Sequence, residues 1–506
     1  MREVDFRNTF IDRTHSSARY IYLTHNAYTD LDFPKHWDIS QLLIEISDFL
    51  ERTPFKPYMC PSANLKETEG INLTVNHSSG GPKVRPFRLV HPVIYTSLVN
   101  LVTEPDHWHH IKNSFYFYCE NSIVELADID RKFPRGYLSE KVRPIKDWYN
   151  KFETRSIELA ADYPIMVTTD IESFYPSIDP YLFCILLHFK SAEVLRDDLP
   201  SALGLQIAQH IECMSDGEHK GLPVGSPFID VLAELVLCGV DFTLTHRLEK
   251  CNLLSCLDAT ILRYRDEYRI FCKDKATADT LLELLQSAAQ GNGFRLSQTK
   301  TCYHDDVIAG SVKPDQKYWL TAKLPDTLRN ALLAVREIGI SHPNSGSVVK
   351  ALMEILKRGE GSWEDYEKPG AVIVLLASIM ETSPRTYPVC MAIVSRFHNT
   401  QWQNEKIEPA LLNLLNRDTN SLLWAWAHRI GIAKSAAANV CPMLYPQTES
   451  SFHLWNNSWL CDKLLEIFQR CPVVDLERLD NDGNKIDIYE VEMLSRECVR
   501  AVTEWS

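Results

Sequence analysis

The stretch from residue 261 to residue 272 limits the possible folds most strongly, because it places two adjacent acids between apolar residues. Its sequence is Ile-Leu-Arg-Tyr-Arg-Asp-Glu-Tyr-Arg-Ile-Phe-Cys. The apolar residues at both ends predict two buried strands joined by a turn. Asp266 and Glu267 would repel each other there unless a cation, a basic partner or a proton offsets their charge. Because three arginines lie in the same stretch, both a structural turn of ion pairs and a cation site stay open.

A second apolar strand, residues 165–170, also ends in an acid, Asp170, and an aromatic pair, Phe174 and Tyr175, follows it. If the two strands lie side by side, the carboxylates of Asp170 and Asp266 come close together. Carboxylates suit Mg²⁺, and substrate phosphates and water complete its shell. Two such ions can activate an attacking hydroxyl and stabilise a leaving pyrophosphate. The two strands therefore predict a site for two Mg²⁺ ions and nucleotidyl transfer.

These two stretches resemble the active-site motifs of reverse transcriptases. Asp170 followed five positions later by Tyr175 is similar to their first palm motif, and residues 264–267, Tyr-Arg-Asp-Glu, are similar to their Tyr-x-Asp-Asp hairpin. The resemblance implies that Tyr175 excludes ribonucleotides. The implied catalytic residues are Asp170, Asp266 and Glu267, and the implied metal ligands are Asp170, Ile171 through its carbonyl, and Asp266.

Three further segments extend the resemblance, in the order expected of a polymerase. Residues 221–228, Gly-Leu-Pro-Val-Gly-Ser-Pro-Phe, are similar to the loop that supports the incoming nucleotide and template. Residues 293–301 resemble the motif whose lysine lies near the triphosphate, and residues 83–95 resemble a fingers segment of the bacterial abortive-infection and defence-associated branch. The implied nucleotide-binding residues are Lys83, Arg85, Arg88, Tyr175, Gly225, Ser226 and Lys300.

The motif order implies an α+β right-hand polymerase, with fingers and a palm built on an antiparallel sheet. Beyond about residue 320, apolar residues recur at helical spacing between Pro, Gly and Asn turns, which predicts an all-α domain resembling helical repeats. We expect the fingers and N-terminal region at 1–160, the palm at 161–320 with residues 76–100 packed on it, and the helical, thumb-like domain at 321–506.

The formal net charge of −14 excludes indiscriminate binding to DNA, because polynucleotide binders owe affinity to Lys and Arg on phosphates. The 14 cysteines include no Cys-x-x-Cys pair, which suits reduced thiols in a cytosol. The first residues lack the apolar core of a signal peptide, and no apolar run approaches the ~20 residues that span a bilayer. These observations predict a cytoplasmic protein with no membrane partner; a homo-oligomer is compatible with the many expected helices.

Several alternatives stay open at this level. Glu267 could bind a metal, hold a metal-bound water or pair with an arginine. Residues 303–306, Tyr-His-Asp-Asp, match the hairpin motif more closely than residues 264–267, but their polar flank favours a surface turn. Residues 107–110, His-Trp-His-His, lack further ligands at the usual zinc spacing. The tryptophans beyond residue 420 favour core packing over stacking on nucleic-acid bases.

Three functions follow from these predictions. The first is an RNA-directed DNA polymerase that adds dNTPs and acts in anti-phage defence, as the resemblance implies, with a structured RNA or a DNA product as its nucleic-acid partner. The second is a palm that adds nucleotides without a template. The third is a catalytically idle palm that serves as an RNA-binding or assembly scaffold.

Overall fold

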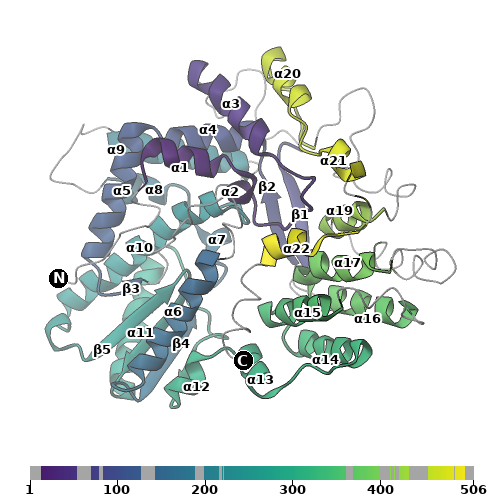
Figure 1. Cartoon of the computed structure of the whole chain (residues 1–506). Coiled ribbons are helices and arrows are strands. Elements are labelled where there is room, and N and C mark those ends of the chain that lie inside the picture. The colour runs from purple at the N-terminus through teal and green to yellow at the C-terminus, as the bar shows by residue number, and fades with distance from the viewer. Residues whose placement is uncertain are drawn as a thin grey trace.

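The computed structural model contains a mixed α+β fold in which a small sheet is surrounded by helices (Figure 1). Most of the predicted motifs fall within the part of the chain that the structure describes. The described residues are 13–53, 70–78, 84–126, 143–188, 199–215, 219, 221–359, 369–397, 411, 415, 421–431, 454–481, 483 and 485–495.

A five-stranded sheet carries the two acidic strand ends, in the order β3-β5-β6-β4-β7. Strands β5, β6, β4 and β7 pair antiparallel, and β3 pairs parallel to β5. The expected antiparallel sheet is therefore mixed, because the long connection between β3 and β5 permits a parallel pairing. The strands are β3 (Glu125–Leu126), β4 (Ile165–Asp170), β5 (Ala259–Tyr264), β6 (Glu267–Cys272) and β7 (Cys302–His304).

Helices cover both faces of this sheet, which explains why its strands are apolar on both sides. Side chains alternate between faces along a strand. Met166 and Phe271 belong to a cluster with side chains of α6 (Arg143–Leu159) and α12 (Val307–Ser311) on one face. Val167, Ile261 and Ile270 point to the opposite face and belong to the main core with α10 and α11. Helix α10 spans Pro227–Lys250, and α11 spans Lys275–Gly291.

The N-terminal region adds helices and a separate two-stranded antiparallel sheet of β1 (Leu73–Ser78) and β2 (Val84–Leu89). Strand β2 leads directly into α4 (Pro92–Val102), whose first turn has His91 as its cap and Pro92 at the first helical position. The other helices before α10 are α1 (His15–Tyr22), α2 (His25–Tyr28), α3 (Ser40–Arg52), α5 (Pro105–Glu120), α7 (Phe174–Ser177), α8 (Leu182–Leu186) and α9 (Leu199–Met214).

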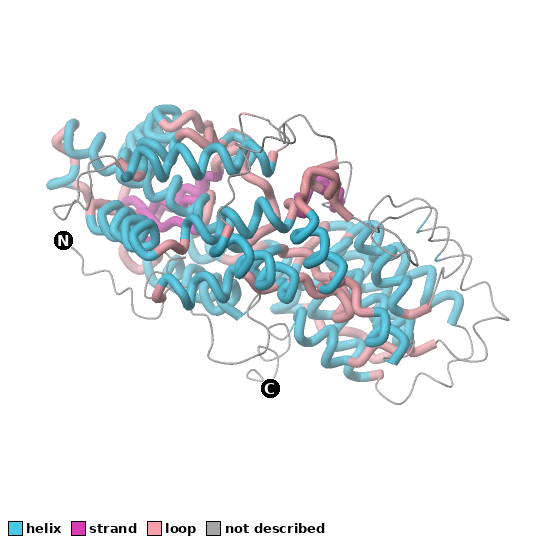
Figure 2. Tube along the Cα trace, turned by 90° about the horizontal axis from the view of Figure 1, so that it is seen from above, coloured by secondary structure: helices cyan, strands magenta, loops and turns pink. Residues whose placement is uncertain are grey.

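Beyond residue 305, the described part of the chain consists of helices and loops, and one end of the molecule is built from them (Figure 2). These helices are α12, α13 (Pro314–Thr321), α14 (Leu328–Ser341), α15 (Gly346–Arg358), α16 (Pro369–Thr382), α17 (Tyr387–Ser395), α19 (Ser421–Arg429), α20 (Asp462–Arg470), α21 (Leu476–Asn481) and α22 (Ile488–Ser495). None of the helices in the described ranges is long and apolar enough to cross a bilayer.

Two tryptophans of this helical region pack against the N-terminal region. The indole of Trp455 donates to the Leu89 carbonyl over 3.1 Å, and that of Trp426 donates to the Asp32 carbonyl over 2.7 Å. Both rings are buried. They therefore join the two regions through the core, as the sequence favoured, and do not offer stacking surfaces for bases.

Candidate active site

The end of β4 and the turn between β5 and β6 bring Asp170 and Asp266 next to each other. Asp170 lies opposite Glu267 in the antiparallel pairing, and the Ile171 amide donates to the carbonyl of Asp266 over 3.0 Å. A two-residue turn joins the strands, and Arg265 takes left-handed backbone there, with φ of 48°. The two segments singled out in the sequence, about 95 residues apart, thus meet at one sheet end.

The paired charges perturb the ionisation of Asp266. Burial, and then the negative charge of Asp170, raise the pKa of Asp266 to about 6. Lys300 lies beside them, and its ammonium donates to Asp170 Oδ2 over 2.8 Å. The three predicted residues therefore form a cluster of two acids and one base in which negative charge is only partly offset.

The oxygen donors fit Mg²⁺, which needs few protein carboxylates. Within the described ranges, no group of three or more His, Cys, Asp or Glu side chains is arranged to hold a metal ion. An ion held here would therefore take the Asp170 and Asp266 carboxylates and the backbone carbonyl of Ile171, whose side chain is buried. The raised pKa of Asp266 shows that a further positive charge would stabilise the pair.

Glu267, predicted to be catalytic, is held by an arginine in the structure. Its Oε1 accepts bonds from Arg269 Nε (3.1 Å) and Nη2 (3.0 Å). Arg269 is buried and also donates to the Ser156 hydroxyl and the Ser311 carbonyl, both at 3.0 Å. Residues two apart on a strand share a face, so the longer glutamate side chain reaches the arginine. Of the three roles left open, the structure shows arginine pairing, and the predicted catalytic role of Glu267 stays a prediction.

Tyr175 is fixed at both ends of the residue. Its hydroxyl donates to Asp230 Oδ1 over 2.6 Å, and its backbone carbonyl accepts the amide of Leu222 over 2.9 Å. Asp230 lies in the first turn of α10, and Leu222 lies in the Gly-Leu-Pro loop. The aromatic residue that follows Asp170 is thus attached to the loop and to the helix after it.

The loop from Gly221 to Ser226 connects the palm motif with strand β2. The Gly221 amide donates to the Ile178 carbonyl over 2.8 Å, and the Val224 carbonyl accepts the Arg88 amide over 3.0 Å. Gly225 has φ of 102°, and a Cβ there would lie 2.3 Å from Phe87 Cδ1. Glycine is therefore required at position 225 by backbone conformation and by close packing.

Ser226 and Gly225 both bond to the N-terminal region, and their predicted contacts with a nucleotide stay predictions. The Ser226 side chain is buried, and its hydroxyl donates to the Ala27 carbonyl over 2.9 Å. The Gly225 carbonyl accepts the Asp30 amide over 2.7 Å. The motif resembles a nucleotide-supporting loop, and these two residues anchor it to α2 and to the segment that follows it.

The basic fingers residues are placed only in part. Arg88 is half-buried on β2, and its Nη1 donates a hydrogen bond to the Met214 carbonyl over 3.4 Å. Arg85 belongs to β2, but its side chain lies outside the described residues, as does the whole of Lys83. Contacts of Lys83 and Arg85 with a triphosphate therefore stay predictions.

The two competing motifs have ordinary structural roles. In α5, the His107 ring bonds to the Leu101 carbonyl (2.8 Å), and the His110 ring bonds to that of Leu187 (2.7 Å). Residues 303–306 begin in the edge strand β7, and Asp306 caps α12 by accepting the Ala309 amide over 2.9 Å. Two of the histidine rings thus bond to backbone carbonyls, and the second Tyr-x-Asp-Asp sequence runs from the exposed edge strand into a turn at the surface, as its flank favoured.

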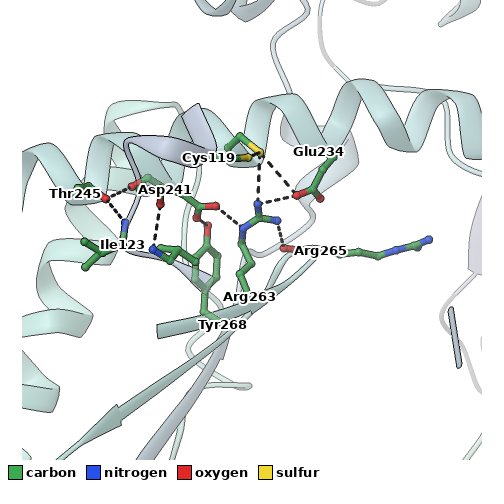
Figure 3. A network of polar contacts seen from close by, with 11 residues as sticks. Cys119, Ile123, Glu234, Asp241, Thr245, Arg263, Arg265 and Tyr268 are labelled. Carbon is green, nitrogen blue, oxygen red and sulfur yellow. Dashed lines mark hydrogen bonds and ion pairs between the residues drawn. The ribbon is translucent and has the colours of Figure 1, made fainter. Parts of the chain in front are cut away.

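A buried ion network behind the hairpin escaped the sequence analysis (Figure 3). Arg263 donates to Asp241 Oδ2 and to Glu234 Oε1, both at 2.7 Å, and to the Arg265 carbonyl at 3.1 Å. The Tyr268 hydroxyl donates to Asp241 Oδ1 over 2.8 Å. Burial raises the pKa of Asp241, and Arg263 opposes that rise. The signal in the sequence was a set of acids within an otherwise apolar helix.

No family model matches the chain, and no curated protein matches it. Among solved structures, telomerase from Candida albicans in complex with a TWJ fragment of telomeric RNA is similar, at 11% sequence identity and a TM-score of 0.27. The match covers 69% of this chain and 65% of the telomerase chain, so the chain spans less than two thirds of that structure's length.

Proposed function

We propose that the chain is a nucleotidyltransferase of the reverse-transcriptase type, which adds deoxynucleotides to a 3′ hydroxyl using two Mg²⁺ ions. The observation that carries this proposal is the pair of strand-end acids, Asp170 and Asp266, with Lys300 bonded to one of them and Tyr175 placed five residues after it. The division into fingers at 1–160, palm at 161–320 and helical domain at 321–506 belongs to the same proposal.

Each residue of the cluster has a distinct task in this proposal. The Asp170 and Asp266 carboxylates and the Ile171 carbonyl would hold the ions, which supply activation of the hydroxyl and stabilisation of the departing pyrophosphate. Lys300 lies where its ammonium can bind the triphosphate or give a proton to pyrophosphate. The Tyr175 ring would lie against the sugar and exclude a 2′ hydroxyl.

Incorporation of labelled nucleotides tests the proposal directly. Wild-type protein and the Asp266→Ala and Asp170→Ala variants are incubated with each dNTP and MgCl₂, on primed RNA, on primed DNA and without template. We expect incorporation by wild type and a loss of at least ~10³-fold in both variants. Exposed Asp305→Ala is the matched control and should keep the wild-type rate. Equal rates for wild type and Asp266→Ala would refute the metal site.

The biological setting rests on the resemblance of residues 83–95 and 264–271 to defence-associated reverse transcriptases. We propose a role in anti-phage defence, with a structured RNA as template or a product made without one, and with RNA, DNA or a protein hydroxyl as primer. Sequencing the RNA that copurifies with the protein, together with the reaction product, separates templated from untemplated synthesis. A product unrelated to any bound RNA supports the untemplated activity.

An idle palm that scaffolds RNA or an assembly is the second candidate. It is favoured by one observation, that Glu267 pairs with Arg269 and leaves only two acids at the strand ends. Stabilisation by Mg²⁺ without incorporation of any nucleotide, under every template condition, would favour this scaffold over the enzyme.

A further inference from the structure

The buried carboxylate of Asp230 bonds both to Tyr175, which would exclude a ribose 2′ hydroxyl, and to the turn that carries Asp266. Asp230 is 8% exposed, and each of its oxygens has a different partner. Oδ1 accepts the Tyr175 hydroxyl at 2.6 Å, and Oδ2 accepts Arg265 Nη2 at 2.9 Å. Arg265 immediately precedes Asp266 in the turn.

The bond to Asp230 restricts the Tyr175 ring. A tyrosine attached only through its backbone could rotate away from a 2′ hydroxyl at little cost, because side-chain rotamers interconvert readily on a surface. Here the carboxylate holds the far end of the ring through a charge-assisted bond, while Leu222 holds the backbone. The ring can therefore resist a sugar that carries an extra hydroxyl.

The bond to Arg265 restricts the turn. Arg265 takes a left-handed conformation that is costly for a residue with a Cβ, so the surrounding contacts must hold it there. Asp230 holds its side chain, and Arg263, itself paired with Glu234, holds its carbonyl. All the acids in these contacts come from helix α10, so the helix and the turn form one rigid unit.

We propose that Asp230 is a specificity-determining positioning residue, which sets the separation between the Tyr175 ring and the Asp266 turn and thereby the preference for deoxyribonucleoside over ribonucleoside triphosphates. This inference rests on the proposed function, and it adds a residue outside the polymerase motifs. Asp230 acts through Tyr175 and Arg265 and does not itself touch the nucleotide.

Two substitutions separate the two contacts. Asp230→Asn keeps an oxygen for the Tyr175 hydroxyl but loses the charge that pairs with Arg265. Tyr175→Phe keeps the ring and loses the bond. A matched control is Tyr181→Phe, because the Tyr181 hydroxyl donates to the buried Glu212 carboxylate over 3.2 Å in the same way.

The experiment measures kcat/KM for dATP and for ATP with full-length protein and MgCl₂. We expect Tyr175→Phe and Asp230→Asn each to lower the preference for dATP about tenfold, the typical effect of one charge-assisted bond. The double variant should lower it little further, because both changes break the same link from Tyr175 through the Asp230 carboxylate to Arg265. Tyr181→Phe should leave the preference at the wild-type value. Thermal melting of each variant checks that it is folded, and if Asp230→Asn does not fold, Tyr175→Phe tests the contact alone.

The outcomes distinguish this inference from the proposed function. If wild type incorporates dATP but the variants slow dATP and ATP equally, Asp230 is only structural and the inference is overturned. If wild type incorporates neither nucleotide, the proposed function fails. In that case the equilibrium binding of dATP and ATP to wild type and the same variants is measured instead. Loss of a dATP preference in binding then supports the inference. An unchanged preference, or none in wild type, overturns it.

Discussion

Replacing Asp266 with asparagine should stabilise the metal-free protein, and more so at high pH. The pKa of Asp266 rises from an ordinary 3.8 to about 6 on folding, through burial and the charge of Asp170. Because the folded pKa is the higher one, the charged side chain disfavours the fold. This cost is absent below about pH 4, grows between pH 4 and 6 and is complete above pH 6. A tenfold change in ionisation is worth ~1.4 kcal/mol, so the full cost is at most about 3 kcal/mol.

The assay is urea unfolding in EDTA at pH 5 and at pH 8. Asp266→Asn should raise the free energy of unfolding by up to about 3 kcal/mol at pH 8 and by about half as much at pH 5. MgCl₂ at pH 8 should stabilise wild type more than the variant, because the ion offsets the same repulsion. Exposed Asp305→Asn should show neither effect. A variant that is no more stable than wild type at pH 8, or equally stabilised at both pH values, would refute the reasoning.

Three further substitutions test the supports of the site. Arg263→Met should lower the free energy of unfolding by about 3–5 kcal/mol in denaturant titration, because it leaves two buried carboxylates of α10 without their cation. Gly225→Ala should lower it by about 1–3 kcal/mol and lower the melting temperature, because its backbone is left-handed and its Cβ would strike Phe87. Glu267→Gln should lower thermal stability, because it weakens the bonds from Arg269. Its rate of nucleotide incorporation should stay within about tenfold of the wild-type rate. A loss as large as that of Asp266→Ala would indicate that Glu267 is a metal ligand.

The strands and the turn that carry the acids follow from local pattern alone. Residues 165–170 form an apolar run that ends in an acid, and the structure has β4 there. Residues 261–272 form an apolar run with two acids in its middle, and they fall in β5, the turn and β6. Their pairing is what a shared cation site requires, because two carboxylates brought together need a positive charge to offset their repulsion. The parallel pairing of β3 with β5 could not be predicted in this way, because it involves only residues 125–126 of β3 and gives no recognisable strand pattern in the sequence.

The roles of Ser226 and Glu267 could not be obtained from the motifs, because both depend on tertiary partners. Ser226 lies in a loop whose sequence suits a ligand, but the partner of its hydroxyl, Ala27, is distant in the chain. Glu267 lies two residues before Arg269, and only the strand geometry shows that their side chains share a face and a bond. Motif identity places these residues near the site without assigning the direction of each side chain.

The arginines of the hairpin bear on the two interpretations that the sequence left open, a turn of ion pairs and a cation site. Arg263 pairs with acids of α10, Arg265 with Asp230, and Arg269 with Glu267. A turn of ion pairs therefore accounts for Glu267, but none of the arginines that the structure describes is bonded to Asp266. The positive charges of Lys300 and Arg265 lower the pKa of Asp266 less than burial and Asp170 raise it. Negative charge thus remains where the two strands meet, which supports the proposal that a divalent cation binds there through its charge and its preference for oxygen.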